Sequence, residues 1–452
     1  MLLPLYLRVL SAEEYGALAI ILIVSHIAGL ACNGGVDQAM RTHWFDYPAG
    51  GEIHRHYVSQ NITSTVALSL VCGAFFILLT PELFGLLVRN DKVSGHPAFT
   101  ELNFSLAILT ACANRACSSF YVDLQNREQG LQYFFFKAMY FAISVALQSC
   151  FLIIFDAGIS GIFVATSIAS ICQLFTLLTI RRDLLTWRLD LALVGASLKF
   201  SAPLVMFGLF YLLDSQLDRW MLSHYLSLRD VGIYSLLLSL FGLLNLSLNA
   251  LDSTIRPGLY RLIKQNDGAG DHALPEYSTL YVAFGLWVLG AIHVLEQYLV
   301  VLTASPDFLQ AADYFNLGVL IFIPLIYVRY LGLILLAQTS SLAITLWTLV
   351  KLVITGCLMT LLIPAYGLWG ALWSIFIGQL VNWLAFHKVT SNSAEYFRLK
   401  SHSKLWLSFF STIIVFPLLL DKIHWSELAW TQCIALTALF YGQLKSYFHT
   451  RL

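Results

Sequence analysis

Residues 157–180 read AGISGIFVATSIASICQLFTLLTI, and no charged side chain interrupts the run between Asp156 and Arg181. An α-helix needs about 20 consecutive apolar residues to cross the hydrocarbon core of a bilayer. Only helices and closed barrels satisfy their backbone groups in lipid, and barrel strands alternate in polarity over about 10 residues. This run is continuous rather than alternating, so it predicts a membrane-spanning helix.

The same kind of apolar run recurs along the whole chain. Of the 452 residues, 58% are hydrophobic and 12% are charged, whereas soluble domains carry about 25% charged residues. Residues 1–10 (MLLPLYLRVL) are too short to span, so they predict the tail of a first helix whose beginning is missing. The sequence therefore predicts an all-α polytopic membrane protein. The predicted spans are 15–37, 57–88, 101–122, 131–155, 157–180, 197–221, 231–252, 277–302, 311–336, 341–363, 365–388, 405–420 and 427–447.

Composition and motifs exclude several classes of function. Lys and Arg together number 26, as do Asp and Glu, and no basic run favours a nucleic-acid partner. The eight cysteines show no metal-ligand spacing, and no phosphate-binding GxxxxGK[ST] motif is present, so no metal and no cofactor are expected. A membrane-embedded enzyme would need clustered carboxylates or histidines on a long loop. No loop offers them, so the protein is not expected to be an enzyme.

The distribution of Lys and Arg predicts the orientation, because cytoplasmic loops of membrane proteins are enriched in both residues. With residues 1–10 counted as helix 1, most of these side chains fall in the loops that follow even-numbered helices and at the C-terminus. We therefore expect the loops 181–196 and 389–404, and the C-terminus, to be cytoplasmic.

Matching motifs predict an internal repeat of two halves, and chance coincidence is the alternative. Residues 10–16 (LSAEEYG) are repeated 216 residues later, at 226–232 (LSLRDVG), and 158–161 (GISG) resemble 367–370 (GLWG). An even number of helices in each half makes the two repeats parallel, and transporters built in this way bind substrate between the halves. We expect an N-terminal lobe at 1–196 with helix 1 incomplete, a second six-helix lobe at 197–396, and two additional helices at 397–452.

Four basic residues lie within the predicted spans and are candidates for binding substrate in a central cavity. They are Arg115, Lys137, Arg329 and Lys351, and both Arg–Lys pairs are 22 residues apart. A charge near the bilayer centre costs about 2.5–3.5 kcal/mol on insertion scales and usually faces a cavity or a partner. Arg suits a phosphate-bearing ligand, because its planar fork donates two parallel hydrogen bonds. The alternatives are structural pairing, for example of Arg115 with Asp123, and snorkelling of Lys137 to the interface.

Four acidic residues are candidates for coupling or gating: Asp37, Asp214, Asp218 and Glu296. Asp214 and Asp218 share a helix face, and a helix-end salt bridge with Arg219 is the alternative. Glu296 lies near a helix end together with His293, where plain solvation is the alternative. His26, in the span 15–37, is expected to be a hydrogen-bonded packing residue.

Three stretches resemble the polysaccharide flippases of the multidrug/oligosaccharidyl-lipid/polysaccharide exporter superfamily. They are PLYLRVLSAEEYGALAI (4–20), LQNREQGLQYF (124–134) and LDRWMLSHYLSLRDVGIYSL (217–236). The resemblance implies a MATE-like fold of two six-helix lobes around a partly cationic cavity that opens alternately to the two sides.

The implied substrate is an undecaprenyl-diphosphate-linked oligosaccharide of O-antigen or exopolysaccharide assembly. The resemblance further implies a bacterial inner (cytoplasmic) membrane, contact with membrane lipid, and a polysaccharide polymerase as a partner. A multidrug cation antiporter of the same fold is the alternative. Its cavity should be acidic, and the cations Arg115, Arg329 and Lys351 disfavour it.

Overall fold

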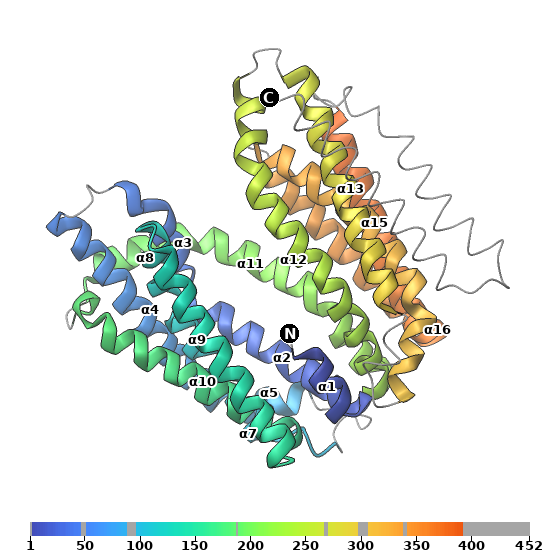
Figure 1. Cartoon of the computed structure of the whole chain (residues 1–452), viewed down its shortest axis with the longest axis horizontal. Coiled ribbons are helices and arrows are strands. Elements are labelled where there is room, and N and C mark those ends of the chain that lie inside the picture. Colours follow the sequence, from blue (N-terminus) through green and yellow to red (C-terminus); the bar gives the residue numbers. More distant parts are fainter. Residues whose placement is uncertain are drawn as a thin grey trace. The chain divides into compact units, whose positions relative to one another are not determined.

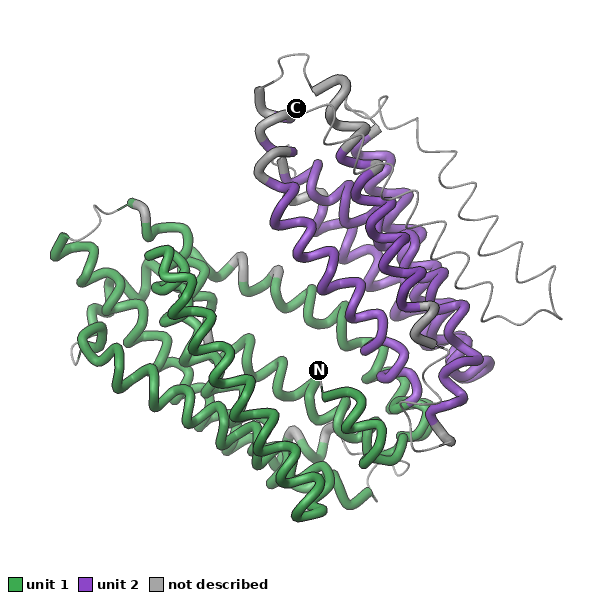
Figure 2. The backbone as a smooth tube through the Cα atoms, viewed as in Figure 1, with its two compact units in different colours: residues 1–232 green, residues 233–452 purple. Residues whose placement is uncertain are grey.

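The computed structural model shows a chain that is helical over most of its described length (Figure 1). The described residues are 2–46, 51–87, 96–186, 189–265, 270–296, 306–337 and 341–391. The predicted helices at 405–420 and 427–447 lie outside them. The chain forms two compact units, residues 1–232 and 233–452 (Figure 2). The lobes expected at 1–196, 197–396 and 397–452 remain a prediction.

The first unit is built around α7, which packs against α2, α4 and α10. A buried cluster that includes Tyr57, Phe120 and Leu177 joins α4 and α10 to the neighbouring elements. The elements of this unit are α1 (Leu3–Val9), α2 (Ala12–Asn33), α3 (Val36–His43), η1 (Trp44–Asp46), α4 (Glu52–Leu78), α5 (Thr80–Leu87), α7 (Glu101–Ala116), α8 (Ser118–Asn126), α9 (Gly130–Ser149), the π-helical turn η2 (Cys150–Ile154), α10 (Gly158–Ile180), η3 (Arg182–Leu184), α11 (Leu191–Tyr225) and the beginning of α12 (Leu228–Gln265).

The second unit is built around α15, which packs against α13 and α16. The ring of Phe241 from α12 stacks on Phe315 and Phe322 of α15, with centroid distances of 5.1 and 4.5 Å. The elements are the remainder of α12, α13 (Gly270–Glu296), η4 (Pro306–Gln310), α15 (Ala311–Ala337) and α16 (Ser341–Ser391).

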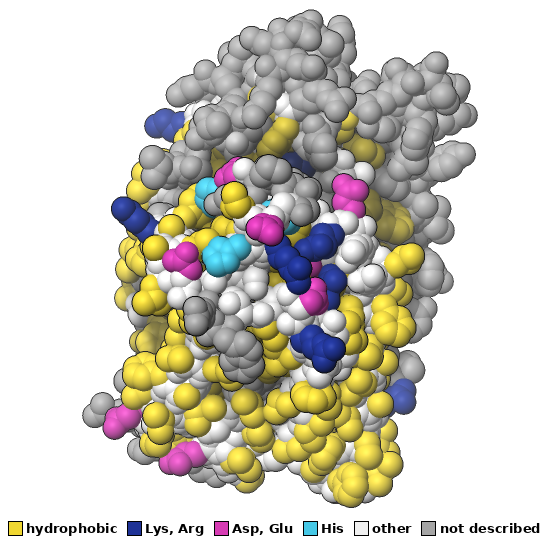
Figure 3. Space-filling model, turned by 90° about the vertical axis from the view of Figure 1, so that its left-hand side faces the viewer, with side chains coloured by type: hydrophobic (Ala, Val, Ile, Leu, Met, Phe, Trp, Pro, Cys, Tyr) yellow, Lys and Arg dark blue, Asp and Glu magenta, His cyan; other side chains and the backbone are white. Residues whose placement is uncertain are grey.

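Seven helices of the described part are long and apolar enough to cross a membrane. They overlap the predicted spans, and one face of the molecule shows a broad hydrophobic area (Figure 3). The chain is therefore a multi-pass membrane protein. The predicted spans leave residues 38–56 and 253–276 as connections, but the structure shows helix in both. The elements α3 and η1 occupy part of the first connection, and α12 extends into the second as far as Gln265. A helix is free to continue beyond lipid because its backbone hydrogen bonds are internal.

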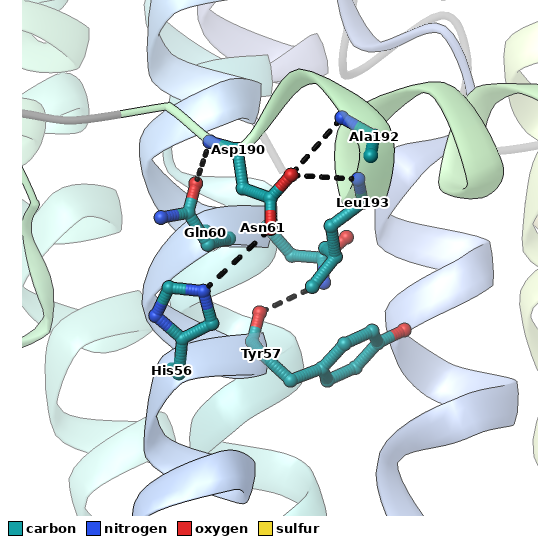
Figure 4. A network of polar contacts seen from close by, with 7 residues as sticks. All are labelled: His56, Tyr57, Gln60, Asn61, Asp190, Ala192 and Leu193. Atoms are coloured by element: carbon teal, nitrogen blue, oxygen red, sulfur yellow. Dashed lines mark hydrogen bonds and ion pairs between the residues drawn. The ribbon is translucent and has the colours of Figure 1, made fainter.

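The beginning of α11 is anchored to α4 by polar side chains (Figure 4). The carboxylate of Asp190 caps α11 by accepting hydrogen bonds from the backbone amides of Ala192 and Leu193, at 3.0 and 3.2 Å. Its own backbone amide donates to Oε1 of Gln60 at 2.9 Å, and Nε2 of His56 lies 3.9 Å from its carboxylate. This junction sets where α11 leaves the first unit.

Replacing Asp190 by alanine should lower the thermal stability of the purified protein, because an N-cap side chain contributes about 1 kcal/mol. Asp190→Asn is the matched control, since asparagine is an equally good cap and should keep the melting temperature close to that of the wild type. Equal melting temperatures for the alanine variant and the wild type would contradict the assigned cap.

The two copies of the internal repeat adopt the same local structure. In α2, Ser11 Oγ accepts from the amide of Glu14 at 3.2 Å, and the amide of Ser11 donates back to the Glu14 carboxylate at 2.8 Å. In α12, Ser227 and Asp230 exchange the same pair of bonds at 3.3 and 3.2 Å. Both helices therefore begin with a reciprocal cap.

The second pair of repeated motifs also matches in backbone conformation. Gly158 begins α10 with φ 54°, and Gly367 interrupts α16 with φ 58°. Only glycine adopts this left-handed region without steric cost. The break at Gly367 separates α16 into two helical segments, as the predicted spans 341–363 and 365–388 require.

The repeated glycines Gly16 and Gly232 meet each other, and both belong to the first unit. A Cβ on Gly16 would overlap the carbonyl oxygen of Leu228, and a Cβ on Gly232 would overlap that of Ala12. Adding 216 to Ala12 and Gly16 gives Leu228 and Gly232, so each contact is the counterpart of the other in the repeat. Small residues at such crossings let helix backbones approach closely.

The predicted orientation is testable by labelling of single cysteines in an otherwise cysteine-free protein. Arg182→Cys, in the loop 181–196, should resist a membrane-impermeant thiol reagent in intact cells and react after the cells are opened. A single cysteine in the loop 389–404 should behave in the same way. Ala157→Cys, between α9 and α10, is the control that should react in intact cells. Ready labelling of both loops would reverse the orientation.

Candidate functional site

Arg115 lies in the last turn of α7 and is half-buried in the first unit. It faces Gly29 of α2, where a Cβ would stand 3.4 Å from the Arg115 Nε. Among the described residues, none forms a hydrogen bond or an ion pair with its side chain. The alternative pairing with Asp123 is wrong, because that carboxylate accepts from Arg127 at 2.8 Å and from Arg181 at 3.1 Å.

We name Arg115, Arg219 and His26 the cationic cluster, because the imidazole of His26 lies within electrostatic reach of both arginines. The ring of His26 is exposed on α2, and both arginines are near enough to act on it electrostatically. Arg219 of α11 donates from Nη1 to Gln216 at 3.0 Å, while its buried Nε has no partner among the described residues. Three helices thus direct two guanidinium groups and one imidazole to a single region.

Arg329 lies within α15 in the second unit and is also half-buried. Its Nη2 donates to Oδ1 of Asn249 at 2.7 Å, and its Nη1 donates to the backbone oxygen of Asn245 at 3.3 Å. Both partners are neutral. The described part of the chain shows no ion pair with Arg329, so no acidic side chain there balances its charge.

The two arginines occupy equivalent places in their own units. Arg115 lies against position 29 of α2, and Arg329 lies against position 245 of α12. Positions 29 and 245 are related by the same 216-residue offset as the capped helix starts. That Arg115 and Arg329 face each other across a cavity remains a prediction.

The two lysines of the predicted set have different environments. Lys137 on α9 is exposed and places its Nζ 3.9 Å from the ring centroid of Tyr121, a cation–π contact. Lys351 on α16 is 7% exposed, and its Cγ would lie 3.6 Å from a Cβ on Gly378. Their proposed role in binding substrate stays a prediction, and within the first unit no contact places Lys137 beside Arg115.

The acidic candidates do not form one group. Asp37 is buried in the first turn of α3, where the helix dipole favours a carboxylate. Asp214 and Asp218 lie on α11, and Asp218 Oδ1 accepts from the backbone amide of Arg219 at 2.7 Å. No ion pair joins Arg219 to either aspartate in the described chain, so the alternative of a helix-end salt bridge with Arg219 is not formed there. Glu296 ends α13, and its side chain lies outside the described residues. Roles in coupling or gating remain predictions.

The arrangement suits an anion that carries oxygen atoms. Arg115, Arg219 and Arg329 are half-buried arginines on apolar helices, and among the described residues none has an acidic partner. A charge held in this way normally faces a cavity or a ligand. Guanidinium groups pair with phosphate through two parallel hydrogen bonds.

Comparison with known proteins identifies the family of the chain. The family model described as polysaccharide biosynthesis protein matches residues 1–263, more than half of the chain. The chain belongs to this polysaccharide biosynthesis protein family. Comparison with curated protein sequences gave no match.

Two similar solved structures show which fold this family member has. The lipid II flippase MurJ in an inward closed conformation gives a TM-score of 0.70 at 14% identity, over 99% of this chain and 95% of that one. A multidrug resistance MATE family transporter of the MOP superfamily, in an inward-facing conformation, gives 0.66 at 12% identity, over 89% and 94%. They confirm the predicted MATE-like, all-α fold.

Sequence reasoning missed Arg219 and His26 as site residues. Asp214 and Asp218 precede Arg219 and suggest a salt bridge as one alternative, and the place of His26 in an apolar span suggests packing. The one sequence signal for Arg219 is its place in the stretch 217–236, which carries the family resemblance. Its proximity to Arg115 depends on how α11 packs against α2, which no local pattern encodes.

Proposed function

We propose that the protein is a flippase that moves an undecaprenyl-diphosphate-linked oligosaccharide across the bacterial inner membrane. Its product would feed the assembly of a surface polysaccharide such as O-antigen or exopolysaccharide. A polysaccharide polymerase on the outer side is the proposed partner that consumes the translocated substrate.

The observation that supports this proposal is the set of half-buried arginines without acidic partners in the described chain. In the first unit both Arg115 and Arg219 lie within electrostatic reach of His26. In the second unit Arg329 contacts position 245, which corresponds by the 216-residue offset to position 29 beside Arg115. A diphosphate offers the oxygen atoms and the negative charge that these guanidinium groups require.

Membership of the polysaccharide biosynthesis family supports the saccharide part of the proposal. The fold shared with a lipid II flippase supports alternating access of the substrate. In the proposed cycle the arginines bind the diphosphate, the oligosaccharide occupies a hydrated lumen, and the prenyl chain stays in lipid. No nucleotide-binding motif is present, so an ion gradient, the membrane potential or the substrate gradient would drive the cycle.

Complementation tests this function directly. Expression in a host that makes the lipid-linked oligosaccharide but lacks its own flippase should restore surface polysaccharide. Without the protein, the lipid-linked oligosaccharide should accumulate and stay inaccessible to an enzyme added outside the cells. Accumulation that persists when the protein is present in the membrane would refute the proposal.

The competing function is a multidrug cation antiporter, which the shared fold with a MATE transporter brings into consideration. A cationic drug would meet Arg115 and Arg219 and be repelled, so this function is disfavoured on charge. Resistance to cationic drugs in the same host, without restored polysaccharide, would reverse the assignment.

A further inference from the structure

We propose that the first unit carries a separate pocket for a phosphate group, and that its ligand is the headgroup of an anionic phospholipid. The pocket has a volume of about 390 Å³ and opens where α4 begins, α8 ends and η3 follows α10. Its lining includes Trp44, His54, Arg55, Asn126, Arg127 and Asp183. None of these residues belongs to the cluster of Arg115 and Arg219, so the inference does not depend on the proposed function.

Two buried polar atoms of the lining have no partner among the described residues. His54 is 5% exposed, and its Nε2 makes no hydrogen bond. The side-chain amide nitrogen Nδ2 of Asn126 is also buried and makes none. Buried polar groups are normally hydrogen-bonded, so two such atoms at one pocket suit a ligand with acceptor atoms. An Asn amide nitrogen only donates, and a His ring nitrogen donates in one tautomer or when protonated.

The indole of Trp44 contacts both His54 and Arg127. The ring of Trp44 meets the ring of His54 edge to face, with centroids 4.5 Å apart. The guanidinium carbon of Arg127 lies 5.6 Å from the same indole. The imidazole and the guanidinium are therefore positioned by one buried side chain before any ligand arrives.

The charge of the pocket favours an anion. Arg127 uses its Nε for the carboxylate of Asp123, which leaves its two terminal nitrogens available. Asp123 also accepts from Arg181, so two arginines more than balance this one acid. Arg55 donates weakly, at 3.4 Å, to the backbone oxygen of Asp183. Asp183 is the single acidic residue of the lining, and its exposed side chain is solvated.

The position of the pocket points to a lipid. His54 and Arg55 lie in the first turn of the candidate span Glu52–Leu78, and Arg181 directly follows the span Gly158–Ile180. The pocket therefore lies at the level where two spanning helices end, which is where lipid headgroups lie. Figure 3 shows basic, acidic and histidine side chains gathered on one face, next to a broad hydrophobic area. The Lys/Arg distribution assigns this end to the cytoplasmic leaflet, where anionic headgroups attract basic residues.

Native mass spectrometry of the full chain in detergent tests the proposal with four probes. Dioleoyl phosphatidic acid should bind, whereas dioleoylglycerol, which has the same acyl chains and no phosphate, should not. Inorganic phosphate and pyrophosphate, added as competitors, show whether the bound phosphate group belongs to a lipid or to a soluble molecule. Failure of both at millimolar concentration to displace phosphatidic acid supports a lipid ligand, and displacement at micromolar concentration would replace the lipid by a soluble phosphate.

Two variants of the lining provide independent tests. Arg55→Gln removes a charge from an exposed side chain, and Asn126→Asp places a carboxylate in the same volume where the amide nitrogen lies. Each should weaken the binding of phosphatidic acid about tenfold or more, as expected when a charge-assisted hydrogen bond is lost. Arg182→Gln is the matched control, because this exposed arginine of η3 does not line the pocket.

Gel filtration and the melting temperature establish that each variant is folded. If Asn126→Asp does not fold, Arg55→Gln carries the comparison alone, because its exposed side chain has little structural role. Equal binding by both folded variants and the control, or binding of dioleoylglycerol as tight as that of phosphatidic acid, would overturn the proposal.

Discussion

Replacing Gly16 by alanine should remove most of the folded protein from the membrane. The new Cβ would overlap the carbonyl oxygen of Leu228 and lie 3.0 Å from the amide nitrogen of Gly232. Both atoms belong to the backbone, so they cannot move aside as the end of a flexible side chain can. Overpacking typically costs about 1–3 kcal/mol and occasionally more, and a clash with two backbones belongs at the upper end. The amount of protein in detergent extracts and its melting temperature measure the loss.

The reciprocal contact makes this prediction specific. Gly232→Ala should have an effect as large as that of Gly16→Ala, because its Cβ would overlap the carbonyl oxygen of Ala12. The double variant should lose less than the sum of the two, since either change alone already forces the helices apart. Gly195→Ala in α11 is the control, because nothing lies within 4 Å of its added Cβ. A large loss from one glycine with none from the other would show that the contact is not reciprocal.

The spans and the repeat were predictable because they depend on local features of the sequence. Apolar length identifies a spanning helix regardless of what packs against it, and α2, α10 and α15 all overlap the predicted ranges. The motifs LSAEEYG and LSLRDVG encode a capped helix start followed by a glycine, which both copies form. Their close approach could be inferred only after the helices were placed.

The helical ends outside the membrane were not predictable from apolar runs. The element α3 is short and polar, with Asp37 near its start and Arg41 in its last turn. Its boundaries follow from Gly34 and Gly35, which both have positive φ and separate it from α2. A search for apolar runs assigns such a segment to a loop.

The candidate site was predictable in part, for a related physical reason. Arg115 and Arg329 stand out in sequence because charge is rare within apolar helices. Arg219 stood next to aspartates, and this proximity in sequence suggested a pairing that the structure lacks. The partner of an arginine depends on side-chain direction and helix packing. Sequence proximity to Asp214 and Asp218 therefore did not predict the environment of Arg219.

Arg329→Ala is expected to insert into the membrane normally and to fail in transport. Its described partners are neutral acceptors, Asn245 and Asn249, so removal of the guanidinium leaves no buried charge unpaired among them. A neutral residue also enters the bilayer more easily than arginine. Loss of a charge-assisted hydrogen bond of about 1.5–3 kcal/mol corresponds to roughly a tenfold to hundredfold slower step. Surface polysaccharide in a flippase-deficient host is the readout, with the level of protein in the membrane measured in parallel.

Arg329→Lys and Arg256→Ala sharpen this test. Lysine keeps the positive charge without the planar fork, so polysaccharide should fall between the levels of the wild type and of Arg329→Ala. Arg256 is exposed on α12, and its removal should leave polysaccharide unchanged. Full polysaccharide with Arg329→Ala at a normal protein level would show that this side chain does not bind substrate. Loss of the protein itself would instead give Arg329 a structural role and move the search to Lys351 and to Arg115.

Arg115→Ala distinguishes a substrate contact from a structural one even more directly, because no described residue forms a hydrogen bond with its side chain. Its removal should therefore leave the melting temperature unchanged while lowering polysaccharide as strongly as Arg329→Ala. If instead the cluster with His26 and Arg219 serves only to solvate the face of α2, Arg115→Ala will transport as the wild type does, and the proposed role of the cationic cluster fails.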